Sequence, residues 1–387
     1  MSATVYYADL HVKDATDNRL AKISRLCQAV GLAALVQPKK RGGADELVAV
    51  KAHFGERGND TYLHPTFARQ VIDLIKEAGG KPFLTDTCTL YNGMRHNAVD
   101  HLETAYLHGF TPYVVNAPVV IADGIIGMSE ELVPVDLKHF KEVHIARAFR
   151  EASAMVVLSH FKGHQMGGFG GAIKNLAMGC ASYAGKIDQH GRNVVIYEEA
   201  CIGCGLCLDS CRQEAISLKK VEEGKTKGKA KGKKKAKISK KKCIGCYECM
   251  TVCKQKAIGV EQPDEHSAFV ERMTEYAYGA VQGKEGRVCY LNFVLNVTPQ
   301  CDCAGWSDPA LVPDLGILAS VDPVALDTAC FDLVKAAPGL VPLPGCGDHC
   351  AGVDKFAGLR PETRGFHQME YAQSIGMGSM AYKLKKV

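Results

Sequence analysis

Short apolar runs alternate with longer amphipathic stretches along most of this sequence. Strands are predicted in the apolar runs at residues 4–8, 46–52, 82–86, 119–122, 154–160, 287–297 and 315–319. Helices are predicted where apolar residues recur every three or four positions, at residues 18–36, 65–78 and 97–108, and across Phe269, Met273, Tyr276 and Ala280. Such alternation is typical of an α/β fold, in which helices cover a mainly parallel sheet.

The stretch from residue 194 to 262 interrupts this alternation and is dense in cysteine, glycine and lysine. Strand and helix signals resume after it. We therefore interpret residues 1–193 and 263–387 as one discontinuous α/β domain, and residues 194–262 as a smaller domain inserted into it.

The inserted stretch contains two cysteine runs, each with the spacing C-x2-C-x2-C-x3-C. This spacing is typical of [4Fe-4S] clusters, and in two-cluster ferredoxins the fourth cysteine of each run binds the other cluster. The predicted fold is the α+β fold of a bacterial-type two-cluster ferredoxin. Zinc sites or disulfides are the alternative, but four-ligand zinc sites leave the third and fourth cysteine of each run unexplained. The predicted ligand sets are Cys201, Cys204, Cys207 and Cys253 for cluster one, and Cys243, Cys246, Cys249 and Cys211 for cluster two.

A lysine-rich segment, residues 219–242, separates the two runs. It holds thirteen lysines and two glutamates, whereas the whole chain has a formal net charge of only +5, so the rest of the protein is mildly acidic. Because the segment has little apolar content, it is predicted to be a flexible loop. It lacks the arginines and interleaved aromatic residues of nucleic-acid binders. Docking of an acidic redox partner protein is the favoured interpretation.

Composition narrows the location of the protein. No run of eighteen apolar residues occurs, so no membrane span is predicted. The N-terminal residues lack the features of a signal peptide, and we expect a cytoplasmic protein. Of the seventeen cysteines, eight belong to the two runs and the others are scattered, which fits a reducing compartment. Oligomeric state leaves no signal in the sequence.

Polar residues gather where predicted strands end, which is where open α/β sheets bind ligands. One group follows the strand at 46–52 and includes His53. A second, residues 159–175, combines histidine, lysine and glycine and leads into a predicted helix. We predict one pocket for an anionic ligand, lined by His53, His160, Lys162, His164 and Lys174. The glycines Gly167, Gly168, Gly170 and Gly171 are predicted to form an anion loop at the helix N-terminus. The alternative is a tight turn flanked by hydrogen-bonded histidines.

Further cysteines lie outside the two runs. Cys301 and Cys303 flank Asp302, but a C-x-C pair cannot supply a complete metal site by itself. Whether these two bind metal stays open, as it does for Cys180, Cys346 and Cys350. Buried or surface thiols are the favoured interpretation for all five. Asp322 precedes Pro323 and is predicted to be a helix N-cap.

Three motifs carry a resemblance to a known family. They are Val50-Lys-Ala-His-Phe-Gly-Glu, Ser159-His-Phe-Lys-Gly-His with Gly-Gly-Ala-Ile-Lys174-Asn-Leu, and Cys301-Asp-Cys with Ser320-Val-Asp-Pro-Val-Ala-Leu-Asp. Together they resemble the domain of unknown function 362 family, in its form with an inserted two-cluster ferredoxin. The resemblance implies an iron-sulfur protein but no particular reaction. The histidine, lysine and glycine cluster is also similar, at the level of fold analogy, to the lactate racemase superfamily, where His and Lys at strand ends serve a nickel cofactor.

Three functions fit these observations. The leading hypothesis is an iron-sulfur oxidoreductase with two [4Fe-4S] clusters, whose electrons reach a substrate or metal site in the predicted pocket. Histidines would relay protons there, and lysines would hold an anionic group. The alternatives are an electron carrier or docking module without its own chemistry, and a metallocofactor maturation factor. The polar groups at the strand ends favour the oxidoreductase, with an additional metal or a small anionic molecule as ligand.

Overall fold

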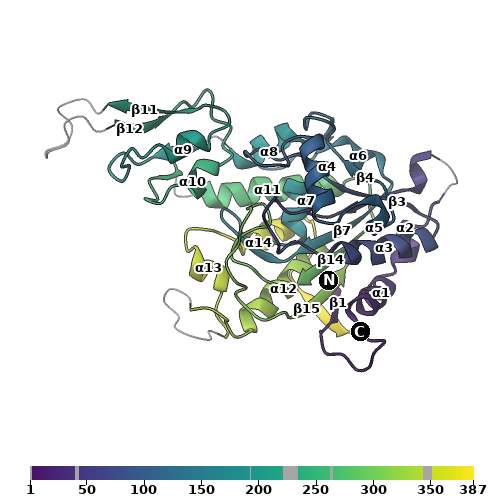
Figure 1. Ribbon diagram of the computed structural model, residues 1–387. Coiled ribbons are helices and arrows are strands. Elements are labelled where there is room, and N and C mark those ends of the chain that lie inside the picture. The colour runs from purple at the N-terminus through teal and green to yellow at the C-terminus, as the bar shows by residue number, and fades with distance from the viewer. Residues whose placement is uncertain (1, 40–42, 192, 221–233, 262–264, 343–350) are drawn as a thin grey trace.

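An eight-stranded sheet forms the centre of the protein (Figure 1). The computed structural model describes residues 2–39, 43–191, 193–220, 234–261, 265–342 and 351–387. In spatial order the strands are β16 (Tyr382–Lys386), β1 (Ala3–Ala8), β15 (Gly316–Ser320), β14 (Val288–Val294), β7 (Ala154–His160), β2 (Leu47–Lys51), β3 (Lys81–Asp86) and β4 (Val119–Ile121).

The sheet is mainly parallel, as predicted. Only β15 runs against its neighbours, β1 and β14, and all other neighbouring pairs are parallel. All seven predicted strands are present. Strand β16 was not predicted, because its sequence YKLKK is largely polar and exposed. It pairs on one side only, with β1, and an edge strand of this kind tolerates lysines on its free side.

Helices cover both faces of the sheet. Successive residues of a strand point to opposite faces, and in β7 the side chains of Val156 and Leu158 join one core while those of Met155 and Val157 join the other. The first core includes helices α1 (Arg19–Ala29), α2 (Leu32–Val36), α3 (Pro65–Glu77), α4 (Ala98–Leu107) and α5 (Pro112–Val115). The second includes α6 (Arg147–Glu151), α7 (Ala172–Cys180), α11 (Glu265–Val281), α12 (Pro323–Ala336), α13 (Lys355–Leu359) and α14 (His367–Ser374).

The predicted helices are found, with one difference. The helix expected at 18–36 is two helices, α1 and α2, separated at Gly31, whose φ of 74° is left-handed and ends the first helix. Asp322 caps α12 as predicted, accepting hydrogen bonds from the backbone amides of Val324 and Ala325. Within the described residues, no helix combines the length and the apolar character needed to span a bilayer.

Smaller elements complete the fold. A short 3₁₀ helix, η1 (Gly43–Glu46), precedes β2. Two hairpins stand apart from the main sheet: β5 (Glu130–Pro134) with β6 (Glu142–Ala146), and β8 (Lys162–His164) with β9 (Gly168–Gly170). Helix α8 (Tyr183–His190) leads from the α/β body towards the cysteine runs (Figure 1).

The cysteine runs lie in a group of short elements beside α8 and α11 (Figure 1). Strand β10 (Val194–Ile196) pairs with β13 (Ile258–Val260), and each run ends in one turn of helix, α9 (Leu206–Asp209) or α10 (Glu248–Thr251). Buried residues of this group, among them Tyr247 and Ile258, belong to the same apolar core as Phe269 of α11. The group is therefore packed against the α/β body.

The prediction of a flexible loop across residues 219–242 was too wide. Strands β11 (Ile216–Lys220) and β12 (Lys234–Ile238) form an antiparallel hairpin that takes in residues 219–220 and 234–238 of that range. Their apolar residues alternate with lysines and pair across the hairpin, Ile216 with Ile238 and Leu218 with Ala236. This period-two pattern was hidden by the lysine content. Residues 221–233, the middle of the predicted loop, lie outside the described residues, and residues 239–242 follow β12 as a turn.

One buried carboxylate joins three elements of the α/β body. Asp327 of α12 accepts hydrogen bonds from the backbone amides of Ala172 and Ile173, at 2.8 and 2.9 Å, and from the side-chain amide of Asn292, at 2.6 Å. It thereby ties α12 to the N-terminus of α7 and to β14. Burial raises the pKa of Asp327 to about 6, so the group is ionised above neutral pH.

Replacing Asp327 should therefore destabilise the fold. In Asp327→Ala three buried donors lose their acceptor, and we expect the free energy of unfolding in urea at pH 8 to fall by about 2–4 kcal/mol. Asp354→Ala is the matched control, because Asp354 also accepts two backbone amides, but at the short helix α13. Loss of that helix cap in Asp354→Ala should lower the free energy of unfolding by about 1 kcal/mol. Equal losses in the two variants would contradict the role of Asp327.

Candidate functional site

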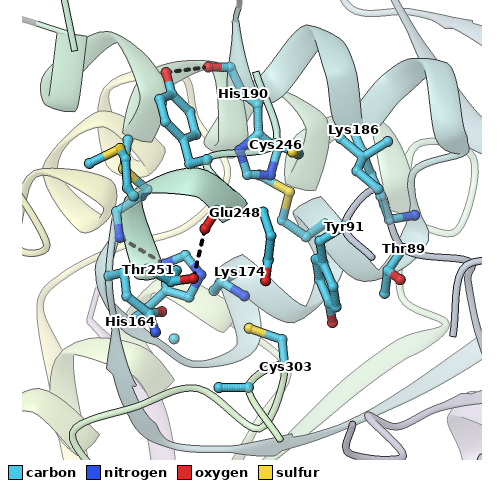
Figure 2. A pocket seen from close by; sticks show the side chains of 18 of the residues that line it. Thr89, Tyr91, His164, Lys174, Lys186, His190, Cys246, Glu248, Thr251 and Cys303 are labelled. Atoms are coloured by element: carbon cyan, nitrogen blue, oxygen red, sulfur yellow. Dashed lines mark hydrogen bonds between the residues drawn. The ribbon is translucent and has the colours of Figure 1, made fainter. Parts of the chain in front are cut away.

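The carboxyl ends of β14, β7, β2 and β3 meet at one edge of the sheet. The chain builds β2, β3 and β4 in one direction and then returns to place β7 on the other side of β2. Ligands bind at such a reversal in open α/β sheets. A cavity of about 1160 Å³ lies here, lined by the segments that follow these strands and by α10 of the cysteine-rich group. Figure 2 shows the side chains that face it.

All five residues predicted for the pocket line this cavity: His53, His160, Lys162, His164 and Lys174. Gly170 and Gly171 also line it, whereas Gly167 and Gly168 lie in the turn behind His164. The glycine-rich stretch is a hairpin, β8 with β9, that leads into α7. The five residues do not share one role, however, because their hydrogen-bond partners differ.

His160 and Lys162 bind a buried carboxylate. The Nδ1 atom of His160 lies 2.9 Å from Oδ2 of Asp302, and Nε2 of the same ring lies 2.9 Å from the carbonyl of Leu295. The ammonium of Lys162 lies 3.1 Å from Asp302. Both ring nitrogens of His160 are thus engaged by the protein, and neither is left for the proton relay that the sequence suggested.

Asp302 is the centre of this network. Burial opposes its ionisation, but His160 and Lys162 hold the pKa of Asp302 well below its usual range. Burial likewise opposes the charge of Lys162, and Asp302 raises the pKa of that ammonium. The side chain of Asp302 also accepts from Thr61, and its carbonyl accepts from the amide of Glu56 at 2.8 Å. Asp302 therefore fixes the loop between Cys301 and Cys303 to the ends of β7 and β2.

A second buried network lies under the cavity. Lys51 at the end of β2 contacts Asp86 at the end of β3, with 3.0 Å between Nζ and Oδ1. The same ammonium donates to the side-chain oxygen of Asn175 in α7 at 2.7 Å. Burial opposes ionisation of Asp86, and Lys51 and its other cationic neighbours lower the pKa of that carboxyl.

Arg95 connects this network to His53. It contacts Glu56 and Asp86, and its guanidinium lies 3.3 Å from Nε2 of His53. Burial and Arg95 lower the pKa of His53, so its ring is neutral.

The N-terminus of α7 does not face a ligand. Its first amides, those of Ala172 and Ile173, already donate to Asp327. The helix N-terminus that follows the predicted anion loop at Gly167, Gly168, Gly170 and Gly171 therefore binds a carboxylate of the protein itself. A carboxylate 155 positions away in the sequence could not be foreseen as its occupant.

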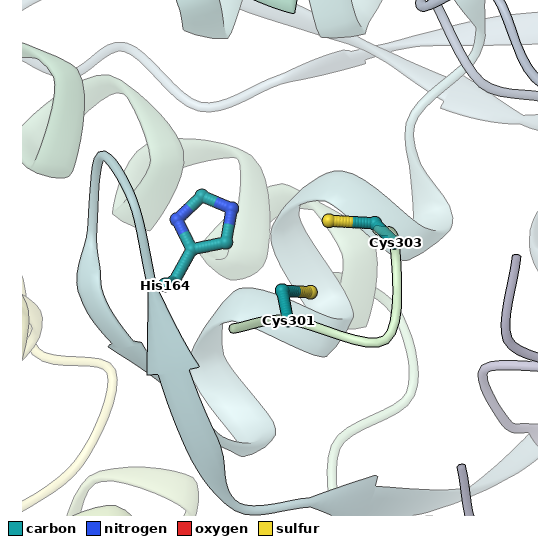
Figure 3. Close-up of side chains that lie close together, drawn as sticks. All are labelled: His164, Cys301 and Cys303. Atoms are coloured by element: carbon teal, nitrogen blue, oxygen red, sulfur yellow. The ribbon is translucent and has the colours of Figure 1, made fainter. Parts of the chain in front are cut away.

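His164 and Lys174 face two thiols. The ammonium of Lys174 lies 3.8 Å from the sulfur of Cys301. The sulfurs of Cys301 and Cys303 and one ring nitrogen of His164 lie within 4.8 Å of one another (Figure 3). A hydrogen bond from the Cys303 thiol, together with the nearby Lys174 and Lys162, lowers the pKa of Cys301. The same hydrogen bond raises the pKa of Cys303. Burial and Lys174 lower the pKa of His164.

The two cysteine runs line two smaller cavities. Cys201, Cys204, Cys207 and Cys253 line one of them, and Cys211, Cys243, Cys246 and Cys249 line the other. Each set combines three cysteines of one run with the fourth of the other. Backbone amides point at sulfurs in both: the amide of Ala236 lies 3.5 Å from Cys201, and that of Ala215 lies 3.3 Å from Cys211. Four thiols with inward amides are a donor set that suits a [4Fe-4S] cluster.

Local backbone geometry shapes these cysteine loops. Gly203, between the first two cysteines of its run, has a φ of 73°. A Cβ at this position would lie 2.1 Å from the carbonyl oxygen of Lys234, so only glycine fits. The cysteine cavities and the large cavity share one wall, because Cys246 lines both the second small cavity and the large one.

Several residues of the site were missed in the sequence. Asp86 is the last residue of β3, and Asp302 and Arg95 lie in irregular segments. Apolar periodicity along the sequence therefore marks none of the three as a site residue. The signal that was available is charge near the predicted site residues, since Lys51 and Glu56 flank His53 and Asp302 lies between Cys301 and Cys303. Cys301 and Cys303 were interpreted as inert thiols, because the sequence does not show Lys174 and His164 beside them.

The chain matches a known family over most of its length. The family described as "Domain of unknown function (DUF362)" matches residues 48–332, about three quarters of the sequence. The chain therefore belongs to this family. No curated protein shows significant similarity to it.

One similar solved structure is titled as the lactate racemase apoprotein from Thermoanaerobacterium thermosaccharolyticum. It shares 12% sequence identity with this chain at a TM-score of 0.39, over 76% of this chain and 51% of that one. The chain thus spans about half the length of that structure. A likeness of this size says nothing about the chemistry of the cavity.

The Asp302 network gives a prediction about stability. In Asp302→Asn the buried ammonium of Lys162 and the ring of His160 lose their anionic partner, and the free energy of unfolding should fall by about 3–5 kcal/mol. Asp308→Asn is the control, because Asp308 is exposed in the same loop and accepts one bond from Gln300. It should change stability by less than about 1 kcal/mol. Guanidinium unfolding of both variants measures the difference, and an Asp302→Asn protein as stable as the control would refute the network.

Proposed function

We propose that this member of the DUF362 family is an iron-sulfur oxidoreductase, in which two [4Fe-4S] clusters supply single electrons for chemistry in the large cavity. The observation that carries the proposal is the position of Cys246. This residue lines the small cavity of the second cysteine set and also the large cavity. An electron carrier without its own chemistry has no need for a large cavity with charged side chains in its wall next to one of its cluster ligands.

The residues present suit the two clusters. Each set offers four thiols from two runs, as crossed ligation in a two-cluster ferredoxin requires, and amides that point at the sulfurs. We assign Cys201, Cys204, Cys207 and Cys253 to the first cluster and Cys243, Cys246, Cys249 and Cys211 to the second.

The exposure of the cysteines indicates the direction in which electrons would pass between the two proposed clusters. Cys204 is exposed at the surface, whereas Cys246 lines the large cavity. The first set is therefore the side where an external electron donor meets the protein, and the second set is the side that faces the substrate. Lysines of β11 and β12, among them Lys219, Lys220 and Lys234, are exposed beside the first set. We assign this hairpin as the docking site of an acidic redox partner.

The cavity itself offers groups for binding and proton transfer. Lys174 and Glu248 face its interior, as Figure 2 shows. Burial raises the pKa of Glu248, which favours its protonated form relative to an exposed glutamate. An acid of raised pKa and a neutral His164 line the same cavity, and such groups suit proton transfer to a substrate there.

Metal analysis tests the clusters. Protein purified without oxygen should contain about eight iron and eight acid-labile sulfide per chain, because each cluster has four of each. The alternative of zinc sites gives zinc and no sulfide. A preparation that reproducibly holds only zinc, or only four iron, would overturn the proposal.

Crossed ligation predicts which cluster each variant damages. Cys211→Ser should alter the cluster bound mainly by the second run, and Cys253→Ser the cluster bound mainly by the first run. Electron paramagnetic resonance of the reduced protein should then show two different residual signals. Cys27→Ala is the control, because Cys27 is buried in α1 away from both sets and its loss should leave both signals intact. If Cys211→Ser removed only the signal that Cys204→Ser also removes, the ligation would not be crossed.

A further inference from the structure

We infer that Cys301 and Cys303 form a redox-active dithiol, which cycles between two thiols and an internal disulfide and reduces small-molecule disulfides in the cavity. The inference names the group that would use the electrons of the proposed function, and it rests on that function only for its reductant. It is carried by the geometry of the two thiols and of the charged groups that surround them.

The first argument is the backbone of the loop. The amide of Ala304 donates to the carbonyl of Cys301 at 2.9 Å, which closes a turn with Cys301 and Cys303 two residues apart. Consecutive Cα atoms are about 3.8 Å apart, so residues in such a turn fall within the roughly 4.4–6.8 Å that a disulfide spans between Cα atoms. The sulfurs already lie within 4.8 Å of each other. Asp302, the residue between the two cysteines, is bound by His160 and Lys162, which holds the loop in place.

The second argument is charge. Lys174 lies 3.8 Å from the sulfur of Cys301, and a cation at this distance stabilises a thiolate. Thiolates are the nucleophiles of thiol-disulfide exchange. Of the two cysteines, Cys303 lines the large cavity and is partly exposed, while Cys301 is buried behind it. Cys303 is therefore placed to attack a substrate when its proton passes to the adjacent Cys301 thiolate, and Cys301 is placed to resolve the product.

The third argument separates a dithiol from a metal site. Two cysteines and a histidine could hold a soft metal ion, but Nδ1 of His164 accepts backbone amides from Gly167 and Met166, at 3.0 and 3.3 Å. A neutral ring that accepts at Nδ1 carries its proton on Nε2, so it offers the thiols a donor and not a lone pair. The ammonium of Lys174 also opposes a metal cation at this position. The carboxylate between the two cysteines, Asp302, is turned away to its own partners.

The reaction balances with these groups. The Cys303 thiol passes its proton to the Cys301 thiolate while its sulfur attacks one sulfur of a substrate disulfide, the substrate S–S bond breaks, and the leaving thiolate takes that proton from Cys301, which becomes a thiolate again. The Cys301 thiolate then attacks the Cys303 sulfur and releases the second substrate thiolate, which is also protonated. One substrate disulfide is reduced to two thiols, and the protein is left with the Cys301–Cys303 disulfide. Two electrons from a low-potential one-electron donor, and two protons, restore the dithiol.

Redox poise followed by peptide mapping tests the inference. Protein purified without oxygen is equilibrated in mixtures of oxidised and reduced dithiothreitol, quenched with acid, unfolded in guanidinium with N-ethylmaleimide so that buried thiols also react, and digested. We expect Cys301 and Cys303 to become protected together, as one two-electron step. Cys27 serves as the internal control and should be alkylated at every potential. Independent alkylation of Cys301 and Cys303 throughout the range would overturn the inference.

Trapping the mixed disulfide tests the assigned order of attack. With oxidised glutathione, Cys301→Ala should accumulate one glutathione on Cys303, because the resolving thiol is gone. The Cys27→Ala control should form the internal Cys301–Cys303 disulfide and keep no glutathione. When it is combined with Cys301→Ala, Lys174→Met should slow formation of the adduct about tenfold at pH 7, because the charge of Lys174 also acts on the Cys303 sulfur. If the Cys301→Ala protein formed no glutathione adduct on Cys303, the assignment of Cys303 as the attacking residue would be wrong.

Metal content of the same samples separates the two proposals. Loss of iron in a protein that still forms the Cys301–Cys303 disulfide would overturn the clusters and leave the dithiol standing. Full iron content without the disulfide would overturn the dithiol alone. One equivalent of a metal other than iron, lost in both Cys303→Ala and His164→Ala, would show that the three residues form a metal site instead.

Discussion

The cavity depends on pairing of charges that the fold has removed from water. An isolated buried charge costs several kcal/mol, and it persists only where an opposite charge and hydrogen bonds surround it. Asp302 meets this condition with His160, Lys162 and Thr61, and Lys51 meets it with Asp86 and Asn175. Each of these pairs joins segments far apart in the sequence. The buried charges therefore hold the ends of separate strands in one arrangement around the cavity.

The same constraint explains why two kinds of polar residue share one cavity wall. His160 and Lys162 bind Asp302, so they position the loop that carries Cys301 and Cys303. His164 and Lys174 follow or face the same hairpin, but they direct their polar atoms towards the two sulfurs. Period-two alternation brings His160, Lys162 and His164 to one side. Their roles differ because His160 and Lys162 contact the buried carboxylate of Asp302, whereas His164 lies beside the two sulfurs.

Much of the fold could be predicted from periodicity. The seven predicted strands and the helices α3, α4 and α11 follow directly from apolar spacing, since a sheet covered on both faces needs such runs. Strand β16 and the β11–β12 hairpin were missed because lysines dominate their sequences, although alternate apolar residues in the hairpin still pair. The candidate site was predicted only in part. Local sequence identified the strand ends, but Asp302, Asp327 and Arg95 act through contacts across more than thirty residues, which spacing along the chain does not reveal.

The position of the cysteines links the two halves of the protein. The first cysteine set reaches the surface at Cys204, the second reaches the large cavity at Cys246, and Cys303 lines that same cavity. In Figure 2, Cys246 and Cys303 lie on opposite sides of Lys174 and Glu248. Reduction of a disulfide takes two electrons and two protons, and the two clusters that we propose would supply the electrons one at a time. Under that proposal, the wall that the second cysteine set and the large cavity share at Cys246 connects the inserted domain to the chemistry of the α/β body.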